Sequence, residues 1–495
     1  MIYLKKKTTV RVSYQRGEAQ MDQCRAALVF LFFAIIASKG HSTPLAGRET
    51  WDYLEVRDGA HMFWWLYYAD SQFVKYQEFP LIMWLQGGPG GSGSGFGNFG
   101  EIGPLNTDLK PRKTSWVKAA NVLFVDNPVG SGFSYTDKPD RYATDVATVA
   151  SDMLTLLKHF FAKLDEFQTV PFYIFSESYG GKMAAAISLE LVKAIEQGEL
   201  KCKFAGVALG DSWISPVDSV MTWGPYLYAT SLLDNQGLDE VNSAAEAVKR
   251  AVEEQLFQKA TELWSVVETV VEQNTNGVNF YNILSQTSED NVVSSAGNNL
   301  ISIQASRHIR PLQEQSLSEL MNGPIREKLH IIPENVTWGG QAEEVFTYMA
   351  GDFMKPVVDI VDQLLTAGVN VTIYNGQLDL IVDTLGQELW VQKLKWRGLP
   401  GFNKLKWTAL EDPAALGVTR AFYKTHKNFA FYWILRAGHM VRIYSIIGIQ
   451  MQLILRTKNR KNKRTKQEQT KKTHEVESYF SLYFRGCLFR KTLCI

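Results

Sequence analysis

The fold is decided by the stretch Phe172-Tyr-Ile-Phe-Ser-Glu-Ser178-Tyr-Gly-Gly181, in which an apolar run leads through a serine to two glycines. The run Phe172–Phe175 predicts a buried strand, and a helical pattern begins directly afterwards, at Lys182. A serine on such a turn is held clear of the backbone, beside helix amides that favour negative charge. The stretch therefore predicts a nucleophile elbow around Ser178. The alternative is that Ser178 only caps the helix.

Further short apolar runs on both sides of this turn end in turn-forming residues and predict more buried strands. They are Leu81–Leu85, Val122–Val125, Ala205–Leu209, Val369–Tyr374 and Phe429–Leu435. Helical patterns at Val146–Leu157 and Lys182–Ile195 lie between some of them. Strands and helices alternate in this way in a mostly parallel sheet that is covered on both faces, so we predict an α/β protein.

Between the two groups of predicted strands the composition changes. Glu/Ala/Val-rich helical patterns lie around Asn242–Thr269, and a polar Ser/Asn stretch follows at Ser285–Asn299. We interpret residues 212–329 as a mainly helical cap, with a mobile loop inside it, inserted into a core formed by residues 44–211 and 330–441.

The composition is that of a globular protein, with 495 residues of which 45% are hydrophobic and 21% charged. Nine Lys/Arg and the single acid Glu468 lie in Arg456–Lys472, so the net charge of +1 leaves −7 on the remaining residues. A mildly acidic body argues against nucleic acid as a partner of the folded part. No His-Glu-x-x-His motif or paired Cys/His spacing indicates a metal site, and we expect no cofactor.

The N-terminal region predicts export. Arg25 precedes the apolar run Ala26–Ala37, and small and polar residues follow it. This is the layout of a secretory signal, and the run is too short to span a bilayer comfortably. We therefore expect residues 1–43 to be an extension and signal peptide, with Met21 a better start than Met1, in a secreted or lysosomal protein. The alternative is that the run is a buried helix.

Two sequons, Asn335-Val-Thr337 and Asn370-Val-Thr372, are possible glycan sites in an exported protein. Cysteines do not frame the fold, because one of the four would leave with the signal. They are Cys24, Cys202, Cys487 and Cys494.

A serine nucleophile needs a histidine base and a carboxylate that fixes the tautomer of the histidine. Functional groups gather at the carboxyl ends of strands in such sheets, and the acid follows the serine in the chain of an α/β-hydrolase. Asp379 lies in the loop after the strand predicted at Val369–Tyr374. We choose Asp379 as the acid, with Asp383 as the competing choice.

Three histidines follow these acids in the chain, and only one of them lies directly after a predicted strand. His439 follows the strand Phe429–Leu435, whereas His426 precedes that strand and His474 is in the basic tail. We therefore choose His439 as the base.

The acyl intermediate also needs two backbone donors aimed at its oxyanion. The strand Leu81–Leu85 runs into the glycine-rich loop Gln86–Gly95, which has few side chains to block a close approach. The alternative is a flexible linker. We predict that the amides of Gly88 and Tyr179 form the oxyanion hole.

Six segments together resemble the motif set of the serine carboxypeptidase family, and the similarity covers residues 51–441. They are Trp84-Leu-Gln-Gly-Gly-Pro-Gly-Gly91, Glu101-Ile-Gly-Pro104, Asp126-Asn-Pro-Val-Gly-Ser-Gly-Phe-Ser-Tyr135, Ser176-Glu-Ser-Tyr-Gly-Gly181, Asn375-Gly-Gln-Leu-Asp379 and Gly438-His-Met-Val441. The resemblance implies an α/β-hydrolase fold. It also implies the release of single residues from peptides with a free C-terminus. We expect a monomer or homodimer without a transmembrane anchor.

The resemblance also implies how the terminal carboxylate is bound. The positions that match the family's carboxylate site are Gln86, Glu101 and Glu177. Acidic groups can bind a carboxylate only if they share a proton, because like charges this close repel and raise one pKa. We therefore expect activity to peak at acidic pH, which suits a lysosome.

The sequence departs from the family at four places. Gln86 stands where most members have Asn, Ser176 where most have Gly, and Gln377 replaces the first acid of a Gly-Asp-x-Asp pattern. After Val441 the family continues with Pro and a closing helix, but here Arg442 opens unrelated sequence.

The segment 442–495 is expected to be a solvated, disordered tail. Its basic run could instead bind an anionic membrane or nucleic acid. Loss of the closing helix could loosen His439.

Two other functions remain open at this stage. One is a carboxypeptidase-like binding protein that the altered C-terminus has disabled. The other is an acyltransferase or esterase, because the same triad and oxyanion hole serve either acceptor. Glu101 and Glu177 favour the peptidase.

Overall fold

The structure, a computed structural model, describes residues 47–71, 73–286, 300–412 and 415–441. The predicted signal peptide, most of the predicted mobile loop and the predicted disordered tail lie outside these residues. Within the described residues, no helix is both long enough and apolar enough to cross a membrane.

Eleven strands within the described residues form one mixed sheet, in the order β1-β2-β4-β3-β6-β7-β8-β11-β10-β9, with β5 paired to β2. The six central strands are parallel to one another. They are β4 (Asn121–Val125), β3 (Leu81–Leu85), β6 (Pro171–Glu177), β7 (Lys203–Gly210), β8 (Val371–Gly376) and β11 (Phe429–Ile434). This mostly parallel sheet confirms the predicted α/β architecture.

Antiparallel strands flank the centre on both sides. They are β1 (Glu49–Arg57), β2 (Ala60–Tyr67) and β5 (Tyr135–Thr136) on one side, and β10 (Ala415–His426) and β9 (Thr408–Asp412) on the other. The sequence analysis did not predict these strands.

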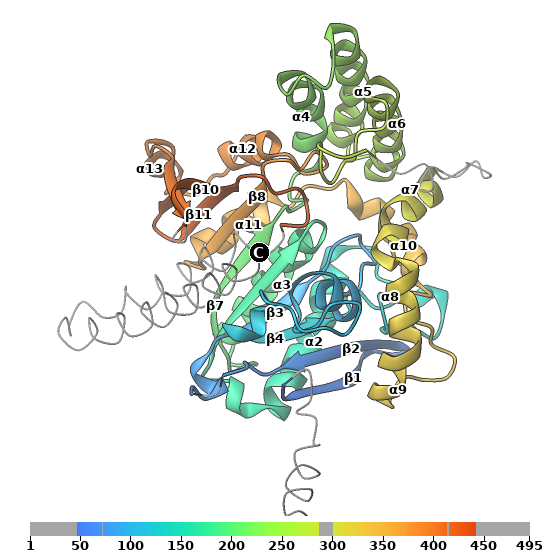
Figure 1. Cartoon of the computed structure of the whole chain (residues 1–495), viewed down its shortest axis with the longest axis vertical. Helices are drawn as coiled ribbons and strands as arrows, with labels where there is room; N and C mark the ends of the chain where they lie inside the picture. The colour runs from blue at the N-terminus through green and yellow to red at the C-terminus, as the bar shows by residue number, and fades with distance from the viewer. Residues whose placement is uncertain (1–46, 72, 287–299, 413–414, 442–495) are drawn as a thin grey trace, which may run out of the picture. The chain divides into compact units, whose positions relative to one another are not determined.

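Three helices pack in a row against the sheet: α2 (Val146–Lys163), α3 (Gly180–Glu196) and α11 (Val358–Thr366). The central helix, α3, contacts β3, β6 and β7 (Figure 1). Helix α2 begins at an N-cap, because the Asp145 side chain accepts a hydrogen bond from the Thr148 amide. Helix α3 follows the predicted nucleophile directly, so its N-terminus lies at the site.

The predicted cap range contains six α-helices in its described residues. They are α4 (Pro216–Ala229), α5 (Asn235–Glu253), α6 (Phe257–Thr275), α7 (Leu300–Ile309), α8 (Gln315–Leu320) and α9 (Arg326–Leu329). Helix α5 packs between α4 and α6, and the three stand side by side (Figure 1). A mainly helical insertion is what the sequence predicted there.

The remaining helices follow the cap. They are α10 (Ala342–Phe353), α12 (Thr384–Gln392) and α13 (Leu399–Asn403). Short single-turn helices lie at Tyr76–Glu78, Trp116–Lys118, Pro139–Arg141, Asp165–Phe167, Arg310–Gln313 and Met321–Ile325. A longer π-helix, η2, lies at Gly93–Ile102.

Strand β8 begins two residues later than predicted. Gly368 has a φ of +80° and ends α11, and the Val369 amide still donates to the Leu364 carbonyl of that helix. The apolar run at Val369 therefore belongs partly to a helix end, which the run itself could not reveal.

Candidate active site

Ser178 lies on a sharp turn between the end of β6 and the start of α3. Its φ is +60°, in the left-handed region that non-glycine residues rarely adopt. The Ser178 amide donates to the Gly210 carbonyl at 3.1 Å, and its carbonyl accepts from the Trp213 amide at 3.0 Å. The end of the neighbouring strand β7 thus holds the backbone of Ser178 in place, and this turn has the form predicted for a nucleophile elbow.

Glycines around Ser178 allow the chain to pass at close range. A Cβ on Gly87 would lie 2.5 Å from the Ser178 Cβ, and one on Gly180 would lie 2.5 Å from the Leu85 carbonyl oxygen. A Cβ on Gly181 would lie 2.1 Å from the Ser212 Oγ. A side chain at Gly87 or Gly180 would push the end of β3 and its loop away from the elbow, and one at Gly181 would displace Ser212.

The glycine-rich loop after β3 is buried and hydrogen-bonded, which excludes a flexible linker. The hydroxyls of Ser92 and Ser94 both donate to the buried Asp126 carboxylate, at 2.7 and 2.6 Å. Within the described residues, the amides of Gly88 and Tyr179 donate to no backbone carbonyl. Because Gly87 is packed on Ser178, the next residue, Gly88, belongs to the part of the loop that lies near the nucleophile.

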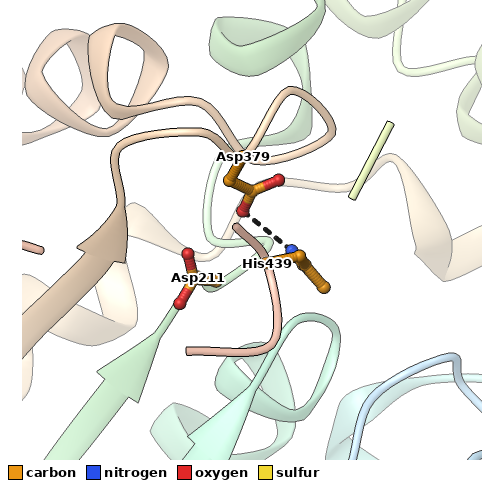
Figure 2. Close-up of side chains that lie close together, drawn as sticks. All are labelled: Asp211, Asp379 and His439. Atoms are coloured by element: carbon orange, nitrogen blue, oxygen red, sulfur yellow. Dashed lines mark hydrogen bonds and ion pairs between the residues drawn. The ribbon is translucent and has the colours of Figure 1, made fainter. Parts of the chain in front are cut away.

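Asp379 and His439 lie together, as predicted. The His439 Nδ1 is 2.8 Å from the Asp379 Oδ2, and both side chains are buried (Figure 2). The Val382 amide donates to the other Asp379 oxygen at 3.1 Å. A carboxylate on Nδ1 leaves the opposite nitrogen, Nε2, unprotonated and able to accept a proton.

The competing acid, Asp383, has a structural role. Its carboxylate caps α12 by accepting from the Gly386 amide at 2.9 Å, and it accepts from the Thr222 hydroxyl at 2.8 Å. Two other histidines follow the candidate acids in the chain. His426 ends β10 and packs beside Trp396, and His474 lies outside the described residues.

Burial lowers the pKa of His439 to about 4, although the nearby Glu177 carboxylate opposes the shift. The imidazole therefore stays neutral, and can act as a base, over most of the acidic range.

The three predicted carboxylate-binding residues form one buried network. The Gln86 Nε2 donates to the Glu177 Oε1 at 2.9 Å, and the Gln86 Oε1 accepts from the Trp84 indole at 2.8 Å. Glu101 and Glu177 are hydrogen-bonded to each other, and both are buried. Burial raises the pKa of Glu177. Two carboxyl groups can be hydrogen-bonded only if one of them is protonated, so this pair holds a proton.

One acid of the site, Asp211, was not predicted. It lies directly after β7, and its Oδ1 accepts from the Gly376 amide at 2.7 Å. Ligand atoms of Asp211, Asp379 and His439 all lie within 4.8 Å of one another (Figure 2). Such a set could hold a divalent metal. The His439 Nδ1 is already hydrogen-bonded to Asp379, which argues against a metal at this place. The position of Asp211 after the strand predicted at Ala205–Leu209 is the signal that could have found it.

The cap also holds both loops of the predicted triad. The Phe280 carbonyl accepts from the amides of Leu380 and Ile381, at 3.0 and 2.9 Å. The Tyr281 carbonyl accepts from the His439 amide at 2.8 Å, and the two rings are 5.2 Å apart. In the family, a closing helix follows the histidine loop, and this sequence lacks that pattern after Val441. The contact with Tyr281 holds His439 without such a helix. Backbone bonds of this kind leave no signal in the sequence.

A buried ion pair fixes α3 to α10 beside the nucleophile. The Lys182 Nζ is 2.8 Å from the Asp352 Oδ2, and neither side chain is more than 3% exposed. The Tyr179 hydroxyl donates to the same oxygen at 2.6 Å. The pair therefore also positions Tyr179, whose amide belongs to the predicted oxyanion hole.

We expect Lys182→Met to lower the free energy of unfolding by about 3–5 kcal/mol, because it leaves a charge at Asp352 buried without its partner. Urea unfolding followed by circular dichroism measures the loss. Lys193→Met is the control, since the Lys193–Glu190 pair on the same helix is 48% and 40% exposed. It should cost less than about 1 kcal/mol. Equal losses in the two variants would contradict a stabilising role for the buried pair.

The two sequon asparagines have different surroundings. Asn335 is exposed, whereas Asn370 is half-buried and its side-chain amide donates to the Ala205 carbonyl at 2.8 Å. Asn335 is therefore the more accessible of the two for a glycan.

Comparisons with known proteins agree with the sequence motifs. The family model described as serine carboxypeptidase matches residues 40–447. The chain is 63% identical over 400 residues to the retinoid-inducible serine carboxypeptidase of Homo sapiens, which covers 80% of this chain and 88% of that protein. It is 44% identical over 414 residues to serine carboxypeptidase-like 51 of Arabidopsis thaliana, over 80% of this chain and 89% of the relative.

Among solved structures, a prohormone-processing carboxypeptidase of Saccharomyces cerevisiae has the same fold. Its TM-score is 0.71 at 20% identity, over 84% of this chain and 92% of the other. The predicted α/β-hydrolase fold is confirmed.

Proposed function

The chain belongs to the serine carboxypeptidase family and is a serine-type carboxypeptidase, and from this premise we propose which of its residues carry the reaction and in which pH range it works. We assign Ser178 as the nucleophile, His439 as the base and Asp379 as the acid that orients the histidine. The observation that carries this assignment is the buried 2.8 Å contact between Asp379 and His439. It comes with a serine on a strained turn at the end of β6.

The reaction proceeds through an acyl-enzyme. His439 takes the proton of the Ser178 hydroxyl as the oxygen attacks the last peptide bond, and the amides of Gly88 and Tyr179 stabilise the oxyanion. His439 then gives the proton to the departing amino acid. Water, activated by the same base, releases the shortened peptide. Asp379 stabilises the imidazolium at each step.

Preference for the last residue comes from the buried network of Gln86, Glu101 and Glu177. We propose that the amide of Gln86 and the shared proton of the two glutamates donate hydrogen bonds to the terminal carboxylate of the substrate. Such donors bind an anion only while the glutamate pair keeps its proton. The substrates are therefore peptides with a free C-terminus, and the enzyme is suited to acidic surroundings.

Rising pH is expected to weaken binding of substrate. The protonated glutamate pair is the binding form, and the pKa of Glu177 is raised by burial, so binding is intact below that pKa and lost above it. KM for a blocked dipeptide should increase about tenfold per pH unit above the apparent pKa of the pair. In Glu177→Gln, a neutral amide replaces the titrating group, and KM should change less than about threefold over the same range.

The control for this experiment is a blocked dipeptide with a C-terminal amide. Its KM should be high at every pH, because no carboxylate is present to be bound. A KM for the free acid that stays constant with pH in the unmodified enzyme would contradict the role of the glutamate pair.

We also propose that the protein is exported, to the secretory route or the lysosome, with a glycan on Asn335. The signal-like N-terminal sequence, the exposed sequon and the preference for acidic pH support this location. A monomer or homodimer remains the proposed assembly.

A further inference from the structure

We propose that Asp211 is a positioning residue that shares a proton with Asp379, donating it as a hydrogen bond that holds the triad carboxylate toward His439. The proposal rests on the assignment of Asp379 and His439 to the triad. It adds a second carboxyl group on which the alignment of the base depends.

The surroundings of Asp211 favour a proton on one of the two acids. Its Oδ1 is satisfied by the Gly376 amide at 2.7 Å. Its Oδ2 is buried and finds no donor among the described residues, and an oxygen of Asp379 lies within 4.8 Å of an oxygen of Asp211 (Figure 2). Two carboxylate oxygens cannot hydrogen-bond each other unless a proton lies between them. A proton at this place satisfies both acids.

The backbone around Asp211 is built to hold it there. Its φ is +41°, and the Asp211 amide donates to the Tyr374 carbonyl of β8 at 2.9 Å. Gly376 approaches the histidine loop so closely that a Cβ would lie 2.1 Å from the Gly438 carbonyl oxygen. Both partners of Asp211 thus come from the end of one central strand, β8, which limits the freedom of the side chain to turn away.

The charges around the pair favour retention of the proton. Within the described residues, no lysine or arginine forms an ion pair with Asp211 or Asp379, and both are at most 1% exposed. The titratable groups that face the pair are Glu177 at the end of β6, Asp383 in the loop before α12, His439, Tyr374 of β8, Tyr226 of α4 and Tyr281 of the cap. None of these groups brings a permanent positive charge.

Burial raises the pKa of Asp211 and of Asp379. Because the two acids interact, they titrate as a pair. The first proton leaves to give a pair with one negative charge and one remaining proton, and the second proton leaves only at higher pH. The singly ionised pair can stabilise the imidazolium of His439 during the reaction. When the second proton leaves at higher pH, two buried anions repel each other, and Asp379 loses the donor that fixes it. The triad then fails on the alkaline side.

The test replaces Asp211 by Asn, whose amide donates at every pH, and by Ala, which removes the donor. The readout is the rate at which a fluorophosphonate inactivates the enzyme between acidic and alkaline pH. This reagent phosphonylates the serine, with fluoride as the leaving group, and needs the triad but no terminal carboxylate. The measurement is therefore independent of the glutamate pair and of peptide release.

We expect the unmodified enzyme to lose reactivity on the alkaline side. Asp211→Asn should keep its acidic rate within about threefold and move the alkaline loss upward by at least about one pH unit. Asp211→Ala should react about 10- to 100-fold more slowly than the unmodified enzyme at acidic pH. Asp383→Asn removes a nearby carboxylate whose charge raises the pKa of Asp379, so it should move the alkaline loss downward, opposite to Asp211→Asn.

An alkaline loss that is the same in the unmodified enzyme and in Asp211→Asn would overturn the proposal. So would a folded Asp211→Asn that reacts as slowly as Asp211→Ala, with folding checked by circular dichroism. If the fluorophosphonate reacts with the expected pH dependence but no peptide is cleaved, the carboxyl pair stands and the assigned carboxylate site fails.

Discussion

Ser178→Ala is expected to lower kcat for release of the last residue of a blocked dipeptide by about 10⁶-fold at acidic pH. The variant loses the hydroxyl assigned as the nucleophile, whereas the proposed oxyanion hole and the carboxylate network remain. KM should therefore change little. Amino-acid release, followed by chromatography, measures both constants.

The matched control is Ser176→Ala, which changes a serine two residues earlier, near the end of β6. The Ser176 hydroxyl donates to the Ala208 carbonyl at 3.2 Å and is buried within the sheet. Removing it should change kcat by less than about threefold, at a cost of about 1 kcal/mol in stability. If Ser176→Ala removed activity and Ser178→Ala kept it, the nucleophile would be wrongly assigned.

Asp379→Asn is expected to lower kcat about 10⁴-fold with KM nearly unchanged. The amide of Asn donates to the imidazole, so His439 would be held in the tautomer that carries its proton on the nitrogen facing Ser178. That nitrogen could then not accept the serine proton. Steady-state rates on the blocked dipeptide give the effect.

Asp383→Asn tests the competing acid under the same conditions. Asn can still cap α12 through the Gly386 amide, so the loop should keep its shape and kcat should stay within about threefold. A larger fall in Asp383→Asn than in Asp379→Asn would transfer the triad role to Asp383.

The central sheet could be predicted because its strands are buried on both faces. Every residue of β3 and of β4 is buried, and such strands appear in the sequence as unbroken apolar runs. Among the flanking strands, β2 contains a buried apolar run at 62–67 that the sequence analysis did not assign to a strand, whereas β9 and β1 gave no such signal. Thr408–Asp412 is mostly exposed, and Glu49–Arg57 mixes charged and aromatic residues in a half-buried strand, so neither contains a run of apolar residues.

The rule that strand ends carry function placed Asp379 and His439, and the structure brings them together. The same rule applied to β7 would have pointed to Asp211, but a lone acid after a strand has no motif to mark it. The support of His439 by Tyr281 could not be predicted, because it depends on a carbonyl that every residue possesses.

The bonds between the cap and the triad loops have a consequence for how such enzymes diversify. A cap attached only at its ends could be exchanged between relatives as a module, bringing a new specificity and leaving the chemistry intact. Here the carbonyls of Phe280 and Tyr281 are partners of the acid and histidine loops. A chimaera with foreign cap helices would therefore have to keep residues 280–283 of this chain. Without them, we expect a slower enzyme.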